Sequence, residues 1–411
     1  NSGTGIWFVL NENVSELISR NIFSALKRTI MMDTKSNLPF RAEHIGSFIR
    51  PPNLLAARAD YELKNISAAD LREIEDREIE KIVKLQTQLG FSAVTDGEFR
   101  RSSYSDSFTT DVFNGVTFGS TLDENWSYSN AAGEKSEARI PRVLDRLVWK
   151  GPTNIKNYKF LSALRHGGVS KVTLPGPCYI HFRAGRDNID RQVYPDLDLF
   201  WGDIVDAYVS ELEALNKAGC CYVQLDETSI AKFGDPKIRL ALTERGDHWK
   251  DLLSLYTDVI NEIIVRAPDE MHIGLHLCRG NKAGSWQAEG GYEDVSRLLF
   301  QKLVLQFYFL EYDSPRAGGF QALRDVPENN KIILGFISTK STAIEKRDEV
   351  LRRIEEAATF ISIDNLGLSP QCGFSGDLIG TGITFDQQCA KAALIVNIAK
   401  EVWGYSPISA I

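Results

Sequence analysis

Short runs of β-branched and aromatic residues alternate with longer stretches whose apolar residues recur three and four positions apart, from about residue 40 onward. A short apolar run is typical of a strand buried on both faces, and the longer spacing is typical of an amphipathic helix. Eight strands are predicted, at residues 41–48, 91–96, 170–176, 221–227, 272–278, 306–312, 331–338 and 360–365. The clearest helices are predicted at residues 67–89, 197–218, 247–266, 341–359 and 385–402. Eight strand–helix repeats predict an α/β fold of the (β/α)8 TIM barrel class.

Residues 100–169 interrupt this alternation, because the segment is too long for a connection between a strand and a helix. We expect a long excursion after the second strand, with a hairpin formed by residues 112–119 and 142–151; a separate small domain is the alternative. Residues 1–31 are expected to be a leader outside the fold, either added to the chain or translated from upstream of its natural start. Residues 32–411 are then expected to be one catalytic barrel that contains the excursion.

The charge and composition of the chain argue against two classes of binding partner. The chain has 47 Lys and Arg residues against 55 Asp and Glu residues, a formal net charge of −8, and no Lys- or Arg-rich block. Neither a nucleic acid nor an anionic membrane is therefore expected as a partner. No uncharged apolar stretch reaches the ~18 residues of a membrane span, and six scattered cysteines do not resemble a secreted disulfide framework. A reducing, cytoplasmic compartment is expected.

Polar residues gather where the predicted strands end. In a barrel of this kind the active site is built at the carboxyl ends of the strands. Parallel strands that are buried on both faces normally avoid such residues, because unpaired polar groups are costly in apolar surroundings. The chemistry-bearing residues at these ends are Gly46, Ser47, Glu98, Asp226, His276, Cys278 and Glu311, and Cys372 follows the last strand.

Four of these residues form a plausible zinc site. Side chains two apart on a strand point to the same face, so His276 and Cys278 can both face one ion. For this pair alone, a core histidine beside a buried thiol is the better explanation. Glu311 and Cys372 at the same level complete a nitrogen, sulfur and oxygen set that zinc accepts, and a thiol substrate could displace the carboxylate.

The remaining polar residues fit an amino acid. Glu98 and Asp226 offer carboxylates to an ammonium group, and Ser47, with Gly46 before it, offers a hydroxyl and backbone N–H groups to a carboxylate. Beside a metal that binds thiols, these groups describe an amino-acid thiol as substrate. The alternative is a structural ion-pair network in which His44, Asp96, Glu98 and Asp226 pair with Arg41, Arg100 and Arg101.

Seven motifs occur in an order that resembles a known family. They are HIGSF (44–48), VTDGEFRR (94–101), LPGP (174–177), QLDE (224–227), GLHLC (274–278), FLEYDS (309–314) and LSPQCGF (368–374). Together they resemble the C-terminal catalytic barrel of the cobalamin-independent methionine synthases and their short stand-alone relatives. The resemblance extends from about Arg41 to Trp403.

The resemblance implies zinc as the cofactor, and methyl transfer from 5-methyltetrahydrofolate to homocysteine, which forms methionine. By analogy His276, Cys278, Glu311 and Cys372 bind the zinc ion. Ser47 would bind the homocysteine carboxylate, and Glu98 and Asp226 its amino group. The chemistry agrees, because a free thiol has a pKa of about 8.5 and coordination to a metal deprotonates it.

Two departures leave the methyl donor open. Full-length members have a second, N-terminal barrel that helps bind the folate tail, and we expect this chain to lack it. GFISTKS (335–341) lacks a histidine thought to protonate the leaving folate nitrogen, and GPCYIHFRAG (176–185) lacks a tryptophan expected near the pterin. Either His181 or water replaces that acid, or the donor is a methyl corrinoid, free or protein-bound, whose cobalt leaves without a proton.

Two rival functions remain. A zinc thiol alkyltransferase of the epoxyalkane:coenzyme M transferase type would use the same metal chemistry. However, Glu98 and Asp226 would repel the sulfonate of coenzyme M. A non-enzymatic zinc protein, with all four ligands permanently closed around the metal, is the other alternative.

Overall fold

The computed structural model describes residues 40–121, 126–165 and 167–407. The predicted leader lies outside these residues. Seven parallel strands form one strongly curled sheet in the order β1-β6-β7-β8-β9-β10-β11. Their bounds are Ala93–Val94 (β1), Val169–Pro175 (β6), Tyr222–Asp226 (β7), His272–Leu277 (β8), Phe307–Glu311 (β9), Lys331–Ile337 (β10) and Leu366–Pro370 (β11). After β6, each strand is hydrogen-bonded to the strand before it in the sheet order, so every carboxyl end lies at the same edge.

Residues 41–48, the predicted first strand, do not form a continuous ladder of hydrogen bonds with a neighbouring strand. They contact the sheet at isolated points instead. Ala42 forms an isolated parallel bridge with Leu368 in β11. At the other end of the segment, the N–H of Phe48 donates to the carbonyl of Gly97, just after β1, at 3.1 Å. The segment therefore contacts the strands at both edges of the curled sheet.

The last predicted strand is misplaced. The strand lies at Leu366–Pro370, whereas residues 360–365 were expected to form it. Ile363–Asn365 instead form a short 3-10 helix, because the hydroxyl of Ser362 accepts a hydrogen bond from the N–H of Asp364 and turns the chain. The strand can begin only after this turn.

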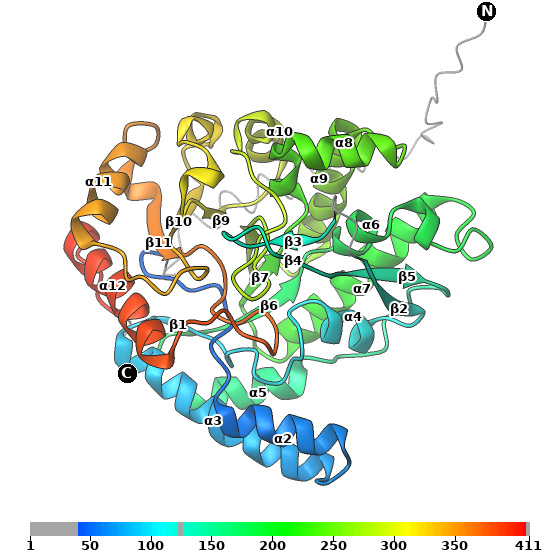
Figure 1. Cartoon of the computed structure of the whole chain (residues 1–411), viewed down its shortest axis with the longest axis horizontal. Helices are drawn as coiled ribbons and strands as arrows, with labels where there is room; N and C mark the ends of the chain where they lie inside the picture. Colours follow the sequence, from blue (N-terminus) through cyan, green and yellow to red (C-terminus); the bar gives the residue numbers. More distant parts are fainter. Residues whose placement is uncertain (1–39, 122–125, 166, 408–411) are drawn as a thin grey trace, which may run out of the picture. The chain divides into compact units, whose positions relative to one another are not determined.

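Helices cover the outside of the strands (Figure 1). Four predicted helices agree closely with α3 (Ala68–Leu89), α7 (Leu197–Lys217), α9 (Trp249–Arg266) and α12 (Phe385–Trp403), and the fifth is shortened to α11 (Arg347–Ala357). The α3 start is fixed by a capping box between Ser67 and Asp70. The further helices are α2 (Pro52–Glu62), α4 (Asp106–Val112), α5 (Ile155–Leu164), α6 (Tyr179–Ala184), α8 (Pro236–Glu244) and α10 (Glu293–Lys302). Within the described part of the chain, none has the length and apolar character to cross a bilayer.

The excursion between β1 and β6 contains the expected hairpin. β2 (Val116–Thr121) pairs antiparallel with β5 (Ala138–Val143), so the second strand lies slightly earlier than residues 142–151. A smaller pair, β3 (Tyr128–Ser129) and β4 (Lys135–Ser136), lies between them in the chain. Ser129 is hydrogen-bonded to the backbone of Trp286 in the loop after β8. The excursion is thus attached to the edge where the strands end.

Candidate active site

Three predicted ligands converge at the carboxyl edge of the sheet. His276 lies near the end of β8, Cys278 directly follows that strand, and Cys372 lies in the loop after β11. One imidazole nitrogen and the two sulfur atoms all lie within 4.8 Å of one another. The sulfur atoms of Cys278 and Cys372 are 4.0 Å apart. Alternation along β8 directs His276 and Cys278 to the same side, as their spacing predicted.

This donor set fits zinc. Two sulfur atoms at zinc–sulfur distances of about 2.3 Å in a tetrahedral site are about 3.8 Å apart, close to the observed separation. The Nδ1 atom of His276 lies 2.9 Å from a carboxylate oxygen of Asp226, while Nε2 faces the carbonyl of Gln371 at 3.2 Å. Zinc-binding histidines ordinarily donate their second N–H to a carboxylate in this way. The cluster of His276, Cys278 and Cys372 is therefore consistent with a zinc site.

Charge within the cluster favours the thiolate at Cys278, whereas the hydrogen bond with Cys278 and burial raise the pKa of Cys372 well above its usual range. The hydrogen bond with Cys372, which outweighs the effect of burial, and the neighbouring His276 hold the pKa of Cys278 well below its usual range. Burial opposes protonation of His276, but Cys278 and Asp226 raise its pKa to about 10. The thiolate is the form of cysteine that binds metals.

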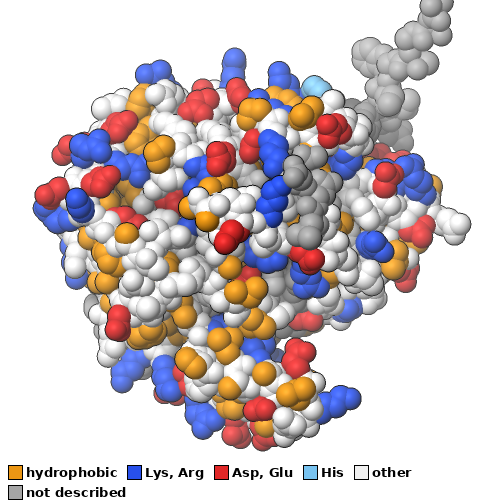
Figure 2. All heavy atoms as spheres, in the orientation of Figure 1, with side chains coloured by type: hydrophobic (Ala, Val, Ile, Leu, Met, Phe, Trp, Pro, Cys, Tyr) orange, Lys and Arg blue, Asp and Glu red, His pale blue; other side chains and the backbone are white. Residues whose placement is uncertain are grey.

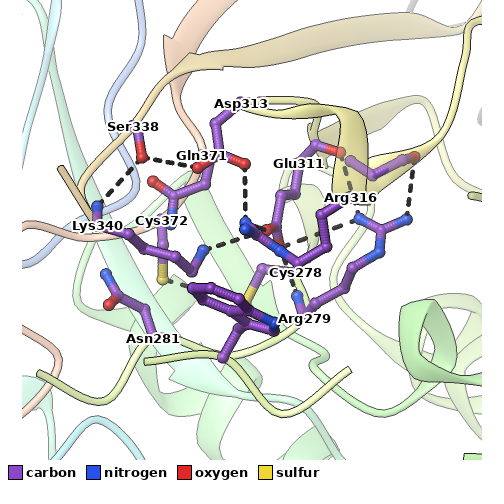
Figure 3. Close-up of polar contacts among 12 residues, drawn as sticks. Cys278, Arg279, Asn281, Glu311, Asp313, Arg316, Ser338, Lys340, Gln371 and Cys372 are labelled. Carbon is purple, nitrogen blue, oxygen red and sulfur yellow. Dashed lines mark hydrogen bonds and ion pairs between the residues drawn. The ribbon is translucent and has the colours of Figure 1, made fainter. Parts of the chain in front are cut away.

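Glu311, the fourth predicted ligand, is held by cations instead (Figure 3). Its completely buried carboxylate accepts the N–H of Arg279 at 2.5 Å and lies 3.0 Å from Arg316 and 3.1 Å from the ammonium of Lys340. Burial alone would raise the pKa of Glu311, but Lys340, Arg279 and Arg316 lower it to about 2. The structure does not include Glu311 in the cluster of ligand atoms, so its coordination of a metal stays a prediction.

A cavity of about 370 Å³ adjoins the three ligands. Its wall includes all three of them together with Ser47, Glu98 and Asp226. Gly46 supports this wall from behind: its φ is +135°, and a Cβ would lie 2.6 Å from the Thr173 side chain. Six of the predicted site residues therefore share one cavity, and a glycine is required where the chain passes close to Thr173 and Glu98.

Glu98 has one carboxylate oxygen without a partner. Oε1 accepts a hydrogen bond from the Thr173 hydroxyl at 2.8 Å. Oε2 is buried and has no hydrogen-bond partner among the described residues. Burial raises the pKa of Glu98, Arg101 opposes the rise, and Asp226 adds to it. A buried oxygen of this kind, in a cavity wall, is a suitable acceptor for a ligand N–H.

The structural ion-pair alternative accounts for little of this site. Arg101 approaches Glu98 at 3.7 Å, which is a weak pair. Arg100 pairs with Glu75 and Asp76, and Arg41 with Asp364, away from the predicted network. Asp226 hydrogen-bonds Gln224 and His276. The predicted network is therefore largely absent from the described residues.

His181 is not positioned as a proton donor. The side chain is buried among aromatic rings, 5.0 Å from Trp201 between ring centroids, and its Nδ1 lies 2.8 Å from the Tyr256 hydroxyl. It is not part of the cavity wall. Burial lowers the pKa of His181 to about 3, so the ring is neutral at physiological pH. Its role as proton donor to the leaving group stays a prediction, which this position away from the cavity wall does not support.

Sequence reasoning missed four aromatic and basic residues of the cavity wall. Tyr104 and Tyr128 come from the excursion, and Tyr179 and Arg183 come from α6. The aromatic content of the excursion was a signal for Tyr104 and Tyr128, but it did not indicate which tyrosines face the site.

Comparison with known proteins shows the family of the chain. A family model described as "Cobalamin-independent synthase, Catalytic domain" matches residues 40–384. The chain is 36% identical to uncharacterized protein YxjH of Bacillus subtilis over 366 residues, which cover 89% of this chain and 95% of that one. It is 23% identical to a methionine synthase of Pyrococcus furiosus, over 87% of this chain and 92% of the relative.

A solved structure supports the same assignment. The putative vitamin-B12 independent methionine synthase from Listeria monocytogenes is similar with a TM-score of 0.71 and 29% identity, covering 90% of this chain and 100% of that one. The match to the family model spans most of the described residues. The chain therefore belongs to the family of cobalamin-independent methionine synthase catalytic domains.

Proposed function

We propose that the protein is a zinc-dependent S-methyltransferase that methylates the thiolate of homocysteine and forms methionine. The proposed donor is 5-methyltetrahydrofolate or a methyl corrinoid. The observation that carries the proposal is the convergence of His276, Cys278 and Cys372 on a cavity whose wall also contains Glu98 and Asp226. Membership of the family supports the reaction class.

In this proposal, each residue of the wall has a distinct task. Bound zinc would supply the thiolate form of the substrate at neutral pH. Asp226 orients the imidazole of His276 through its Nδ1 atom, and the partnerless oxygen of Glu98 accepts the substrate ammonium group. The hydroxyl oxygen of Ser47 accepts a hydrogen bond from the backbone N–H of Ser375. Ser47 also lines the cavity, where its hydroxyl group binds the substrate carboxylate. These contacts place the sulfur beside the metal ligands.

In this proposal His276, Cys278 and Cys372 would hold the zinc ion, and Glu311 would be the ligand that a substrate thiol replaces. Lys340 and Arg316 already hold the carboxylate, so they compete with zinc for it. These two cations would thereby favour the release of Glu311 in the presence of a thiol. Catalytic zinc sites commonly keep one position for substrate.

We also infer that residues 41–48 complete a closed (β/α)8 barrel. The backbone contacts of this segment with β11 and with the residue after β1 support the inference. Closure places Gly46 and Ser47 at the same level as the ends of the other strands, where barrel enzymes carry their active sites.

Methionine formation by metal-quantified protein tests the function directly. Homocysteine is supplied with methyltetrahydrofolate, as mono- and triglutamate, and in parallel with methylcobalamin. Methionine from either donor supports the proposal and identifies the donor. A protein that contains one zinc per chain yet methylates homocysteine with neither donor would contradict it, as would a protein that binds no zinc.

A further inference from the structure

Arg183 is a buried cation in the wall of the cavity. It lies at the end of α6, and the residue is 4% exposed. Its guanidinium donates to the carbonyl of Trp126 at 3.3 Å and to the hydroxyl of Tyr128 at 2.5 Å. The Nε–H group has no hydrogen-bond partner, and no carboxylate forms an ion pair with Arg183, within residues 40–121, 126–165 and 167–407. Its positive charge therefore lacks a counter-ion there.

A second cation lies behind the first. Lys232 is completely buried, and its ammonium makes one long hydrogen bond, 3.4 Å, to the hydroxyl of Thr228 in the cavity wall. It lies 5.2 Å from the ring of Phe182, and it too forms no ion pair with a carboxylate in the described part of the chain. Burial lowers the pKa of Lys232 well below its usual range, and the charge of Arg183 lowers it further, while the charges of Cys278, Glu227 and Glu311 only partly oppose the shift. The two cations thus repel each other in a poorly solvated region.

Such a pair is costly unless an anion compensates for it. An unpaired charge loses several kcal/mol of solvation on burial in a protein, and a neighbouring like charge adds to the cost. The contrast with Arg316 and Lys340 is direct, because those buried cations both contact Glu311. On the face seen in Figure 2 the charged side chains of both signs intermingle. Arg183 is 4% exposed, so its charge belongs to the interior of the cavity and not to a basic surface.

We infer that Arg183, with Tyr128 beside it and Lys232 behind it, is a subsite that binds an anionic group of the methyl donor. The planar guanidinium suits a carboxylate, phosphate or sulfonate, and the partnerless Nε–H is one donor for it. The inference rests on the proposed function, which assigns Ser47, Glu98 and Asp226 to the amino-acid thiol. Arg183 is then left for the second reactant.

The tyrosines make this part of the wall suitable for an organic donor. Tyr104 and Tyr179 face each other edge to face, with ring centroids 6.1 Å apart, and both line the cavity beside Arg183. Arg183 lies 5.2 Å from the ring centroid of Tyr128. Aromatic faces pack against the apolar body of a ligand, while the cation holds its charged end.

Anion binding can be measured without knowing the donor. Inorganic phosphate is titrated into zinc-loaded full-length protein that is saturated with homocysteine, at constant ionic strength, with calorimetry and thermal unfolding as readouts. We expect saturable binding that Arg183→Gln weakens by at least about 10-fold, or about 1.4 kcal/mol. Arg183→Lys keeps the charge but loses the planar fork, and should weaken binding less. Arg191→Gln, which removes the same charge at an exposed position, should change it less than two-fold.

Kinetics then assign the subsite to a reactant. With the donor that supports methionine formation, Arg183→Gln should raise the KM of the donor at least about 10-fold and leave the KM of homocysteine within two-fold. If Arg183→Gln raises the KM of a triglutamate folate but not that of a monoglutamate folate, the anion that Arg183 binds is the folate tail. A corrinoid donor would instead implicate its phosphate group.

Each failure has a distinct meaning. Wild-type protein that does not bind phosphate, or Arg183→Gln and Arg183→Lys variants that both bind it unchanged, would overturn the subsite even if methionine is formed. A rise in the KM of homocysteine alone would overturn its assignment to the donor. Suppose instead that phosphate binding depends on Arg183 but that neither donor supports methylation of homocysteine. This result would count against the proposed function and not against the subsite.

Discussion

Two polar clusters lie at the carboxyl edge of the sheet, and they differ in how their charges are matched. The open cluster consists of Glu98, Asp226, His276, Cys278 and Cys372, all of which line the cavity. The closed cluster consists of Arg279, Glu311, Asp313, Arg316 and Lys340, none of which lines it. In the open cluster one oxygen of Glu98 lacks a partner, whereas in the closed cluster each acid contacts at least one cation.

The difference shows how one strand end can serve both binding and support. Cys278 and Arg279 are adjacent, but the cysteine joins the open cluster and the arginine joins the closed one. Successive side chains leave an extended chain in opposite directions, so one faces the cavity and the next faces the packed interior. Groups with unmatched bonding capacity mark where a ligand binds, and matched groups hold the wall in place.

The largest effect is expected in the open cluster. Cys278→Ser should reduce bound zinc from one per chain to nearly none and lower methyl transfer by at least about 1,000-fold, because serine is a poor zinc ligand. The protein should stay folded, since Cys278 and Cys372 lie beyond the ends of β8 and β11 rather than in the core of the sheet. Metal analysis and far-ultraviolet circular dichroism check both results.

Cys389→Ser is the matched control, because that cysteine lies outside the ligand cluster. It should retain zinc and activity. Unfolding of Cys278→Ser at room temperature would instead identify the metal as structural.

The next largest effect is expected in the closed cluster, on stability rather than on metal. Glu311→Gln should lower the free energy of unfolding by about 3 kcal/mol, because it removes a buried carboxylate and leaves Lys340 and Arg316 without full compensation. Zinc should remain near one per chain, held by the other three ligands. Urea unfolding and metal analysis measure the two quantities on the same sample. Loss of zinc with little loss of stability would move Glu311 into the open cluster.

The sequence could place both clusters at one edge but could not separate them. Alternating strands and helices, together with polar strand ends, located His276, Cys278 and Glu311 at the same level. Whether Glu311 faces a metal or a cation depends on Lys340, from the loop after β10, and on the bend of the chain that brings it near. Such pairing between distant loops leaves no periodic signal in the sequence.

The local errors have similarly specific causes. The last strand was placed too early because residues 360–365 are apolar enough for a strand, while the Ser362 hydroxyl turns them into a 3-10 helix. His181 was a reasonable acid by residue type, but α6 directs it into an aromatic cluster. Arg183, two residues later in the same helix, lines the cavity. The helix orientation that separates these two side chains depends on tertiary packing.

A smaller effect, on substrate affinity, is expected at Glu98. One carboxylate oxygen of Glu98 lacks a partner, whereas both oxygens of Glu311 contact hydrogen-bond donors. Glu98→Gln should weaken homocysteine binding by about 10-fold, because the amide cannot pair with the substrate ammonium group. Stability should stay the same or rise, since the charge of a buried carboxylate is removed. Titration of zinc-loaded protein with homocysteine measures the affinity.

The thiol 4-mercaptobutyrate, which has the chain of homocysteine without the amino group, supplies the control. Its affinity should be equal for wild-type protein and Glu98→Gln. Equal weakening of both thiols would mean that Glu98 supports the wall and does not contact the amino group.

The smallest effect is a pH dependence of stability that has opposite signs for the two kinds of carboxylate. Burial raises the pKa of Glu98 above its ordinary value of 4.5. Between 4.5 and that raised pKa, the folded state binds more protons at Glu98 than the unfolded state, so its contribution to stability falls as pH rises. The difference in unfolding free energy between wild-type protein and Glu98→Gln should therefore be constant below pH 4.5 and shift against the wild type above it. Urea unfolding of both metal-free proteins between pH 4 and 8 measures this difference. A shift in favour of the wild type would mean that Glu98 is stabilised as an anion, in the way that Lys340 and Arg316 stabilise Glu311, and the distinction between the open and closed clusters would fail at this residue.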